Sequence, residues 1–233
     1  MKICLFGVSG IALGKHNLKD PRMDQVDKLV EAQKKTYAQV DVMPEKEMVV
    51  ADSILTTRLA VSDLLMKDLE AVETRLGRDA AEAEKAVLQK LAERLMSEKP
   101  VSAIGLSPDE WKTISAHNFY SSKPVVVAED SELANADALL VRAFQQSGYI
   151  SFLTVGGKEN RAWPIRAGLS AWEAAGTIHT DIQKGFIRAE IIGFADLVEA
   201  GGETQAKRAG KQRLELKTYI MQDYDVTNFR FNK

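Results

Sequence analysis

A glycine-punctuated turn with one lysine is the first place where the sequence could do chemistry. Gly10, Gly14 and Lys15 follow an apolar run at residues 2–6. A phosphate-binding loop has glycine, four residues, then Gly-Lys-Ser/Thr, because backbone amides surround the phosphates, the lysine neutralises them and the hydroxyl holds magnesium. Here the first glycine comes one position late and His16 replaces the hydroxyl residue. We therefore expect at most a weak, degenerate nucleotide site at Gly10, Gly14 and Lys15.

Other residue types that could carry catalysis are poorly spaced for it. The chain has three histidines, and no pair among them has the spacing of metal ligands. Its single cysteine, Cys4, lies in an apolar run, where a buried structural thiol is the expected role. We predict no catalytic residue, no metal site and no tightly bound cofactor, although ATP or GTP could bind weakly.

A run of basic side chains near the C-terminus is the main candidate for binding a polyanion. Lys207, Arg208, Lys211 and Arg213 lie close together, and a helical stretch would place Lys207 and Lys211 on one side. These side chains predict a patch for RNA or another partner. The alternative is an ordinary solvated helix face.

The overall composition and charge indicate which classes of partner are possible. The 233 residues are 45% hydrophobic and 27% charged, which is typical of a globular protein. Lys and Arg number 31 against 33 Asp and Glu, so the whole molecule offers no positive field and RNA contact would depend on a local patch. No stretch approaches the length of a membrane span, and one cysteine fits a reducing compartment. We expect a cytoplasmic protein that contacts neither membrane nor DNA.

The first half of the chain changes from mixed α/β to helical character. Residues 2–6 and 37–42 read as strands, with a polar helix at residues 24–35 between them. From residue 52 to 96, leucines including Leu55, Leu59 and Leu69 recur at helical spacing, with an interruption at Gly77. This pattern predicts two antiparallel helices that form a hairpin.

The second half returns to α/β character. A short helix should open at Pro108, a buried strand should cover residues 124–128, and a helix should run from 134 to 146. Beyond residue 149 short strands alternate with short helices, which predicts a small α+β domain. The strands are expected at residues 149–155, 186–194, 217–221 and 226–231, with helical turns at 170–175 and 203–209.

The C-terminal part carries the most specific pattern in the sequence. It closely resembles the C-terminal domain of the YchF subfamily of Obg-like P-loop ATPases, almost continuously from residue 149 to residue 232. The segments that carry this resemblance are residues 149–156, 161–166, 174–181, 184–190, 209–211, 222–226 and 229–232. Residues 20–24, 99–101 and 123–125 are similar to other parts of the same family.

The resemblance implies a fold and a domain division. It implies a truncated nucleotide domain of α/β type at residues 1–51 and 99–148. An inserted, coiled-coil-like helical hairpin would occupy residues 52–98, and a β-grasp (TGS) domain residues 149–233. Much of the family's nucleotide-domain core has no counterpart between Gly14 and Asp20.

The chain also departs from the family's nucleotide-binding motifs. Pro44-Glu45-Lys46-Glu47 stands where the family has Asp-x-x-Gly, and Ala128-Glu129-Asp130-Ser131 replaces Asn-x-x-Glu. Phosphoryl transfer depends on metal and positioning, so losing these groups together should abolish turnover.

Three hypotheses follow. The first is a non-hydrolysing adaptor for the ribosome, for RNA or for a translation-associated protein. The second is a nucleotide-binding protein that hydrolyses ATP or GTP slowly or not at all, and the third is a structural fragment without activity.

Overall fold

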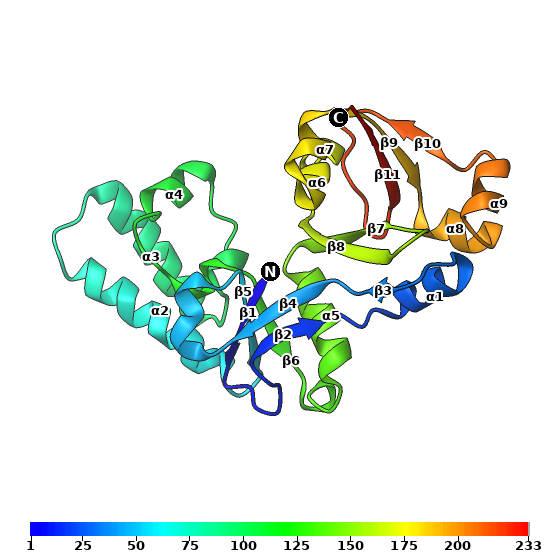
Figure 1. The fold of residues 1–233 in the computed structure, drawn as a ribbon. Helices are drawn as coiled ribbons and strands as arrows, with labels where there is room; N and C mark the ends of the chain where they lie inside the picture. The colour runs from blue at the N-terminus through cyan, green and yellow to red at the C-terminus, as the bar shows by residue number, and fades with distance from the viewer. Residues whose placement is uncertain (233) are drawn as a thin grey trace. The chain divides into compact units, whose positions relative to one another are not determined.

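The computed structural model describes residues 1–232, which divide into two compact units (Figure 1). Unit 1 comprises residues 1–16 and 40–139, and unit 2 comprises residues 17–39 and 140–232. No helix among the described residues is both long enough and apolar enough to cross a membrane. The N-terminal segment thus contributes to both units.

Unit 1 is built on a five-stranded sheet in the order β2-β4-β1-β5-β6. The three pairs formed by β1 with β4, β1 with β5, and β5 with β6 are parallel. Every residue of β5 is buried, as expected for a central strand of a parallel sheet. The strands are β1 (Lys2–Phe6), β2 (Gly14–Asn17), β4 (Gln39–Met43), β5 (Ser53–Thr57) and β6 (Val125–Ala128).

Helices of unit 1 follow β5 and β6. They are α2 (Val61–Leu76), α3 (Glu82–Met96), α4 (Pro108–Thr113) and α5 (Ala136–Gln146), which continues into unit 2. Short 3₁₀ turns are η1 (Glu45–Val50), η2 (Val101–Ala103), η3 (Tyr120–Ser122) and η4 (Asp130–Glu132). The expected helices near Pro108 and before Gly148 and the strand at 124–128 are confirmed, with boundaries that differ by one or two residues.

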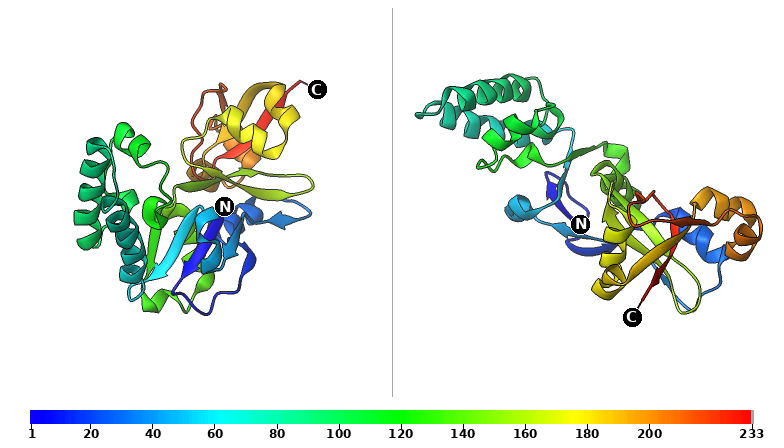
Figure 2. Two further views of the ribbon diagram at one scale, coloured as in Figure 1. Left: turned by 90° about the vertical axis from the view of Figure 1, so that its left-hand side faces the viewer. Right: turned by 90° about the horizontal axis from the view of Figure 1, so that it is seen from above.

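Helices α2 and α3 lie side by side, as Figure 2 shows. Their leucines and valines share one buried cluster, which includes Leu65, Leu69, Leu88 and Leu91. Buried Asp68 fixes α2 to a segment further along the chain, because its carboxylate accepts hydrogen bonds from the amides of Tyr120 and Ser121 at 2.6 and 2.7 Å and from the Ser121 hydroxyl.

The helical prediction was wrong at the start of the 52–96 segment. Leu55 lies in strand β5 and is fully buried, whereas Leu59 lies in the turn after it and is 85% exposed. Their spacing fits a helix by coincidence, since β-strand residues in a parallel sheet are buried on both faces and show no alternation that periodicity could detect.

Unit 2 is built on a six-stranded sheet in the order β10-β9-β11-β7-β8-β3. Helix α6 packs on this sheet through three buried alanines, which join Phe152, Ile191 and Phe229 in one core. The strands are β3 (Lys35–Thr36), β7 (Tyr149–Thr154), β8 (Asn160–Arg166), β9 (Phe186–Ile192), β10 (Arg213–Glu215) and β11 (Val226–Phe231). The helices are α1 (Pro21–Leu29), α6 (Ala171–Ile178), α7 (Thr180–Lys184), α8 (Phe194–Ala200) and α9 (Glu203–Arg208).

Several strand and helix predictions in unit 2 need correction. The strand expected at 217–221 does not form, and β10 takes its place four residues earlier. Strand β8 was not predicted, and the helix expected at 24–35 begins at Pro21 and ends at Leu29. The N-terminal boundary was missed because Asp20 and Pro21 form the cap, with Asp20 accepting a hydrogen bond from the Arg22 amide.

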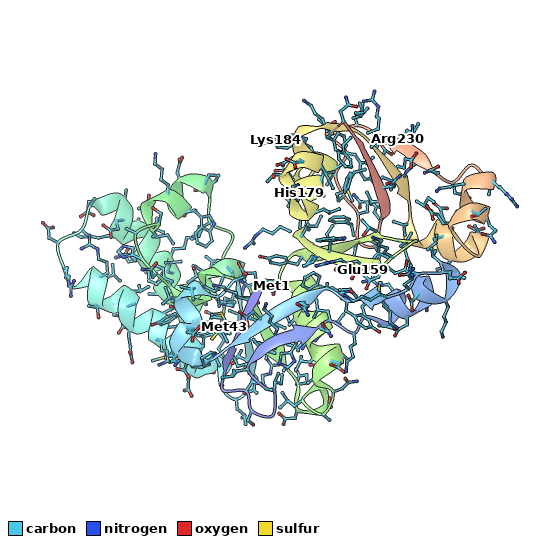
Figure 3. All side chains as sticks on the ribbon, in the orientation of Figure 1. Met1, Met43, Glu159, His179, Lys184 and Arg230 are labelled. Carbon is cyan, nitrogen blue, oxygen red and sulfur yellow. The ribbon has the colours of Figure 1, made fainter. Side chains whose placement is uncertain are left out.

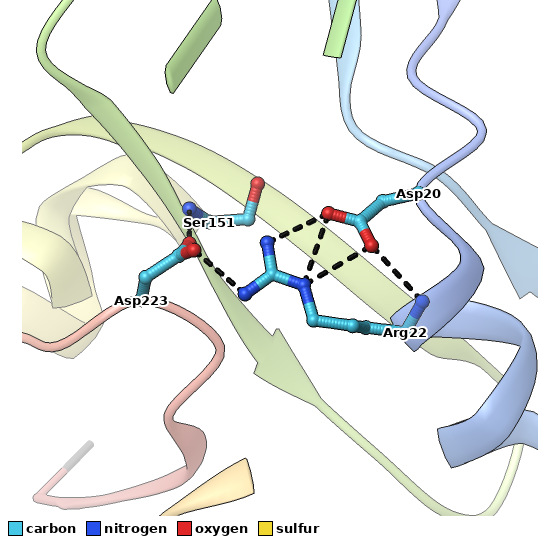
Figure 4. Close-up of polar contacts among 4 residues, drawn as sticks. All are labelled: Asp20, Arg22, Ser151 and Asp223. Carbon is cyan, nitrogen blue, oxygen red and sulfur yellow. Dashed lines mark hydrogen bonds and ion pairs between the residues drawn. The ribbon is translucent and has the colours of Figure 1, made fainter. Parts of the chain in front are cut away.

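A partly buried network of ion pairs and hydrogen bonds connects residues 17–39 to the C-terminal part of unit 2. Arg22 contacts the Asp20 carboxylate at 2.7 Å and the Asp223 carboxylate at 2.8 Å, while the Ser151 amide donates to Asp223 (Figure 4). The guanidinium also lies 3.8 Å from the centre of the Tyr224 ring. This segment is therefore part of the same core-forming unit as the C-terminal residues.

Candidate functional site

The carboxyl end of β1 is where a parallel α/β sheet would be expected to hold a ligand. Gly7 follows β1 with φ of +64°, and a Cβ built on it would lie 2.2 Å from the Cβ of Ala60. Ala60 is the residue immediately before α2. The space beside the first turn is thus filled by the chain's own backbone and by Ala60.

The predicted nucleotide residues lie on the next part of this turn. Gly10 and Lys15 are exposed, and Gly14 and Lys15 begin strand β2. His16, which replaces the hydroxyl residue, has its Nε2 atom 2.7 Å from the carbonyl oxygen of Ala12. A phosphate loop requires a helix directly after the lysine, and a strand lies there instead. The residues present do not fit a nucleotide in the manner of a phosphate loop, and binding at Gly10, Gly14 and Lys15 stays a prediction.

The N-terminus of α1, the first helix after the turn, is already capped by the side-chain carboxylate of Asp20. Pro21 at its first position has no amide N–H, and the Asp20 carboxylate accepts from the amide of Arg22 at 2.9 Å. Amides at a helix N-terminus attract negative charge, and here a side-chain carboxylate supplies it. A phosphate would have to displace Asp20, which is 6% exposed and paired with Arg22.

Two carboxylates that follow the other strands contact groups of the protein itself. After β4, Glu45 lies in η1 and is 3.8 Å from the Lys67 ammonium. After β6, the Glu129 amide donates to the Glu132 carboxylate at 2.9 Å in a reciprocal cap. Among residues 1–232, no group of three or more His, Cys, Asp or Glu is arranged so that it could hold a metal ion.

The basic run is largely paired with acidic side chains. Lys207 contacts Glu203 at 2.6 Å, Lys211 contacts Asp196 at 3.0 Å, and Arg213 contacts Glu215 at 3.3 Å. Helix α9 ends at Arg208, so the expectation that Lys207 and Lys211 share one helical face was wrong. These ion pairs weaken the field that Lys207, Arg208, Lys211 and Arg213 can present, and their role in binding RNA stays a prediction.

A polar face on the unit 2 sheet was not predicted from the sequence. In the antiparallel register of β9 and β11, Glu190 lies opposite Asn228 and Arg188 lies opposite Arg230. The Glu190 carboxylate accepts from Asn228 Nδ2 at 2.8 Å and from Arg230 Nε at 2.7 Å. Burial raises the pKa of Glu190, but these hydrogen bonds outweigh burial and hold the pKa below its ordinary value, so the carboxylate is ionised. Alternation with buried Ala189 could have revealed this face.

An open cavity of about 420 Å³ lies beside this face. Strands β7 and β11 pair in parallel, and their register within the described chain joins Leu153 to Val226 only. Thr154, Glu190 and Asn228 supply polar atoms to the cavity, and Ile178 and Ile182 supply an apolar wall.

Comparison with known proteins agrees with this architecture. The family described as "YchF-GTPase_C: Protein of unknown function (DUF933)" matches residues 149–232. "Ribosome-binding ATPase YchF" of Bacillus subtilis is 30% identical over 246 residues, which cover 78% of this chain and 66% of that protein. "Ribosome-binding ATPase YchF" of Haemophilus influenzae is 32% identical over 235 residues, covering 76% of this chain and 65% of that protein. The chain thus spans about two thirds of the length of these relatives.

The alignments also show that the relatives contain additional internal sequence. The alignment with the Bacillus subtilis protein is 246 positions long, whereas only 78% of the 233 residues of this chain take part in it. The remaining positions are gaps in this chain. Segments of the relative therefore have no counterpart here.

A solved structure shares the fold. The Schizosaccharomyces pombe YchF GTPase matches with a TM-score of 0.77 and 18% identity, covering 99% of this chain and 97% of that one. With the C-terminal family match and the curated relatives, the chain belongs to the YchF subfamily of Obg-like ATPases.

Proposed function

We propose that this protein is a non-hydrolysing YchF-related adaptor that binds the ribosome, through ribosomal RNA or a translation-associated protein. The relatives that carry the name ribosome-binding ATPase support the choice of partner. The local structure at Lys15 supports the absence of hydrolysis. We thus infer the partner from the relatives and the loss of hydrolysis from the residues of this chain.

One observation carries the loss of hydrolysis: Gly14 and Lys15 open strand β2 and not a helix. Catalysis of phosphoryl transfer is almost entirely positioning and charge stabilisation, so a displaced lysine contributes little. The filled space between Gly7 and Ala60 supports the same conclusion. The carboxylates after β4 and β6 are engaged in local contacts.

The domain roles belong to the same proposal. Residues 149–233 act as a β-grasp (TGS) domain, which the strand order β10-β9-β11-β7-β8 around one packed helix supports. Helices α2 and α3 act as the inserted coiled-coil-like hairpin at residues 52–98, and residues 1–51 and 99–148 are the reduced nucleotide domain. The protein works in the cytoplasm, where ribosomes are.

Sedimentation through a sucrose gradient tests the proposed partner. The full chain, mixed with purified ribosomes at low and moderate salt, is expected to sediment with them. An unrelated protein of similar size and charge serves as the control. If all of the protein stays at the top of the gradient under both salt conditions, the proposed ribosome binding is wrong.

Nucleotide binding is the second candidate function, because relatives are named ATPases and GTPases. We expect no measurable ATP or GTP hydrolysis, and a dissociation constant in the millimolar range or weaker, equivalent to about 4 kcal/mol. Calorimetric titration with each nucleotide and magnesium measures it. A micromolar constant that Lys15→Ala abolishes would favour this second function over the first.

A further inference from the structure

Two arginines face each other at one end of the unit 2 sheet. Arg188 in β9 and Arg230 in β11 are directly opposite in the antiparallel register, and both are exposed. Lys184 lies at the same end, as Figure 3 shows, because Gly185 beside it accepts a hydrogen bond from the Asn232 amide just after β11. The sheet thus places several cations on adjacent elements.

Only one of the two arginines is neutralised by a neighbour. Arg230 is paired with the Glu190 carboxylate, which is 8% exposed. The Arg188 guanidinium donates to the carbonyl oxygen of Ile187 at 2.8 Å, and no carboxylate in residues 1–232 forms an ion pair with it. Like charges directly opposite on a sheet are destabilising, and the Glu190 carboxylate compensates only one of these two. A negatively charged ligand would remove that repulsion.

We propose that Arg188 and Arg230 form a phosphate-binding site for RNA on the exposed sheet face, which specifies the contact surface of the proposed ribosome-binding function on which this inference rests. The Arg188 guanidinium can match two phosphate oxygens with parallel hydrogen bonds through Nε and Nη2, whereas Arg230, which donates from Nε and Nη2 to Glu190, offers Nη1. The cross-strand spacing of about 5 Å lets both side chains reach one RNA strand. Exposed Asn228 lies two residues from Arg230 on the same face. Its amide both donates and accepts, and can therefore contact base edges or 2′-hydroxyls.

The charges around this site favour it over the basic run at Lys207. There, three of the four cations have carboxylate partners on neighbouring residues or elements. At the sheet face the Glu190 carboxylate is held by Arg230 and Asn228, and Glu203, which lines the adjoining cavity, is paired with Lys207. Arg188 keeps its full charge for a ligand.

Arg188→Glu is the decisive variant because it breaks no ion pair among residues 1–232. The new carboxylate would lie opposite Arg230 but also two residues from Glu190 on the same face of β9, so we expect the melting temperature to stay within about 2–4 °C of wild type. Affinity for protein-free ribosomal RNA should fall about tenfold or more, and the salt dependence should flatten by about 0.7–0.9 log units per lost phosphate contact. A structural role alone would not weaken RNA binding while the stability of the protein is retained.

Two matched variants locate the effect. Lys158→Glu makes the same change in charge in the exposed turn between β7 and β8 and should leave the affinity within twofold of wild type. Arg208→Glu tests the basic run, and an equal or larger loss there than in Arg188→Glu would overturn the assignment to the sheet face. Unchanged RNA affinity in Arg188→Glu would overturn it as well.

Parallel measurements with intact ribosomes and with poly-glutamate separate the remaining outcomes. RNA binding that depends on Arg188 without ribosome sedimentation would support this site and contradict the proposed function. Ribosome sedimentation without RNA binding, or with binding that poly-glutamate displaces as readily as RNA does, would mean a protein partner and overturn this site. Binding to neither probe overturns both proposals.

Discussion

Gly7 lies in the turn after β1, where a nucleotide would be expected, and packs directly against Ala60. Its φ of +64° turns the chain directly after β1, and its missing side chain lets Ala60 approach. Alanine at position 7 would have to adopt a left-handed conformation and overlap the Ala60 methyl group. The missing side chain of Gly7 is therefore required for the packing of this turn against Ala60 within unit 1.

We predict that Gly7→Ala destabilises the protein by about 2–4 kcal/mol, of which the left-handed backbone contributes about 1–2 kcal/mol and the overlap the rest. Gly10→Ala is the matched control, because Gly10 has φ of +84° and nothing within 4 Å of the point where its methyl group would lie. It should show the backbone contribution alone. Denaturant titration measures both, and equal losses would show that contact with Ala60 is unimportant.

The glycines of the turn could be recognised in the sequence, but the element that follows the turn could not. Gly10, Gly14 and Lys15 approximate a phosphate loop because both kinds of turn need positive φ angles. What separates them is whether a helix or a strand follows, and that depends on pairing between β2 and β4. Contacts of this kind are set by tertiary structure and leave no local signal.

At the scale of elements, α2 and α3 were predicted well and the strand before them was not. Amphipathic helices are recognised by an apolar stripe, which Leu69 and Leu88 belong to, whereas buried β5 is apolar on both faces. Pro108 likewise indicated the start of α4, where the structure shows a capping box formed by Ser107 and Glu110. Alternation in β9 could have revealed the polar side formed by Arg188 and Glu190, but its pairing with Asn228 and Arg230 of β11 is non-local and leaves no local signal.

We expect Leu69→Ala to destabilise the packing of α2 against α3 by about 2–5 kcal/mol, since Leu69 is 7% exposed in their shared cluster. Met66→Ala, in the same helix but 50% exposed, is the control and should cost well under half as much. Amide hydrogen exchange should show faster exchange in both helices and an unchanged unit 2 sheet. Equally accelerated exchange in unit 2 would mean that the two units unfold together.

At the scale of the whole molecule, unit 2 combines residues that are far apart in the chain. Asn160 is fully buried and donates from Nδ2 to the Val30 carbonyl at 2.7 Å and to the Asp27 carboxylate at 2.9 Å, and it accepts from the Gly156 amide. The family resemblance predicted a C-terminal domain beginning near residue 149. It did not predict that α1 and β3 would complete its sheet and core, because those contacts span more than a hundred residues.

Asn160→Ala is therefore expected to destabilise unit 2 by about 1–3 kcal/mol, because buried partners lose their hydrogen bonds. Amide exchange in α1 should accelerate more than exchange in α2. Gln39→Ala removes an exposed amide that bonds Asn17, and should change stability by less than about 0.5 kcal/mol. If α1 exchanges at the wild-type rate in Asn160→Ala, the Asn160 contacts do not hold it in place.

The network of Arg22 also determines the order in which the chain can fold during its synthesis. Arg22 and Asp223 are 201 positions apart. At about 5–20 residues per second, Asp223 is made about 10–40 s after Arg22. Throughout that interval α1 lacks its final packing partners, and residues 40–139 of unit 1 are all made before it ends. Unit 2 can acquire its complete core only after Asp223 has been made, so the apolar side of α1, which carries Met23 and Val26, stays incompletely covered in the nascent chain until then.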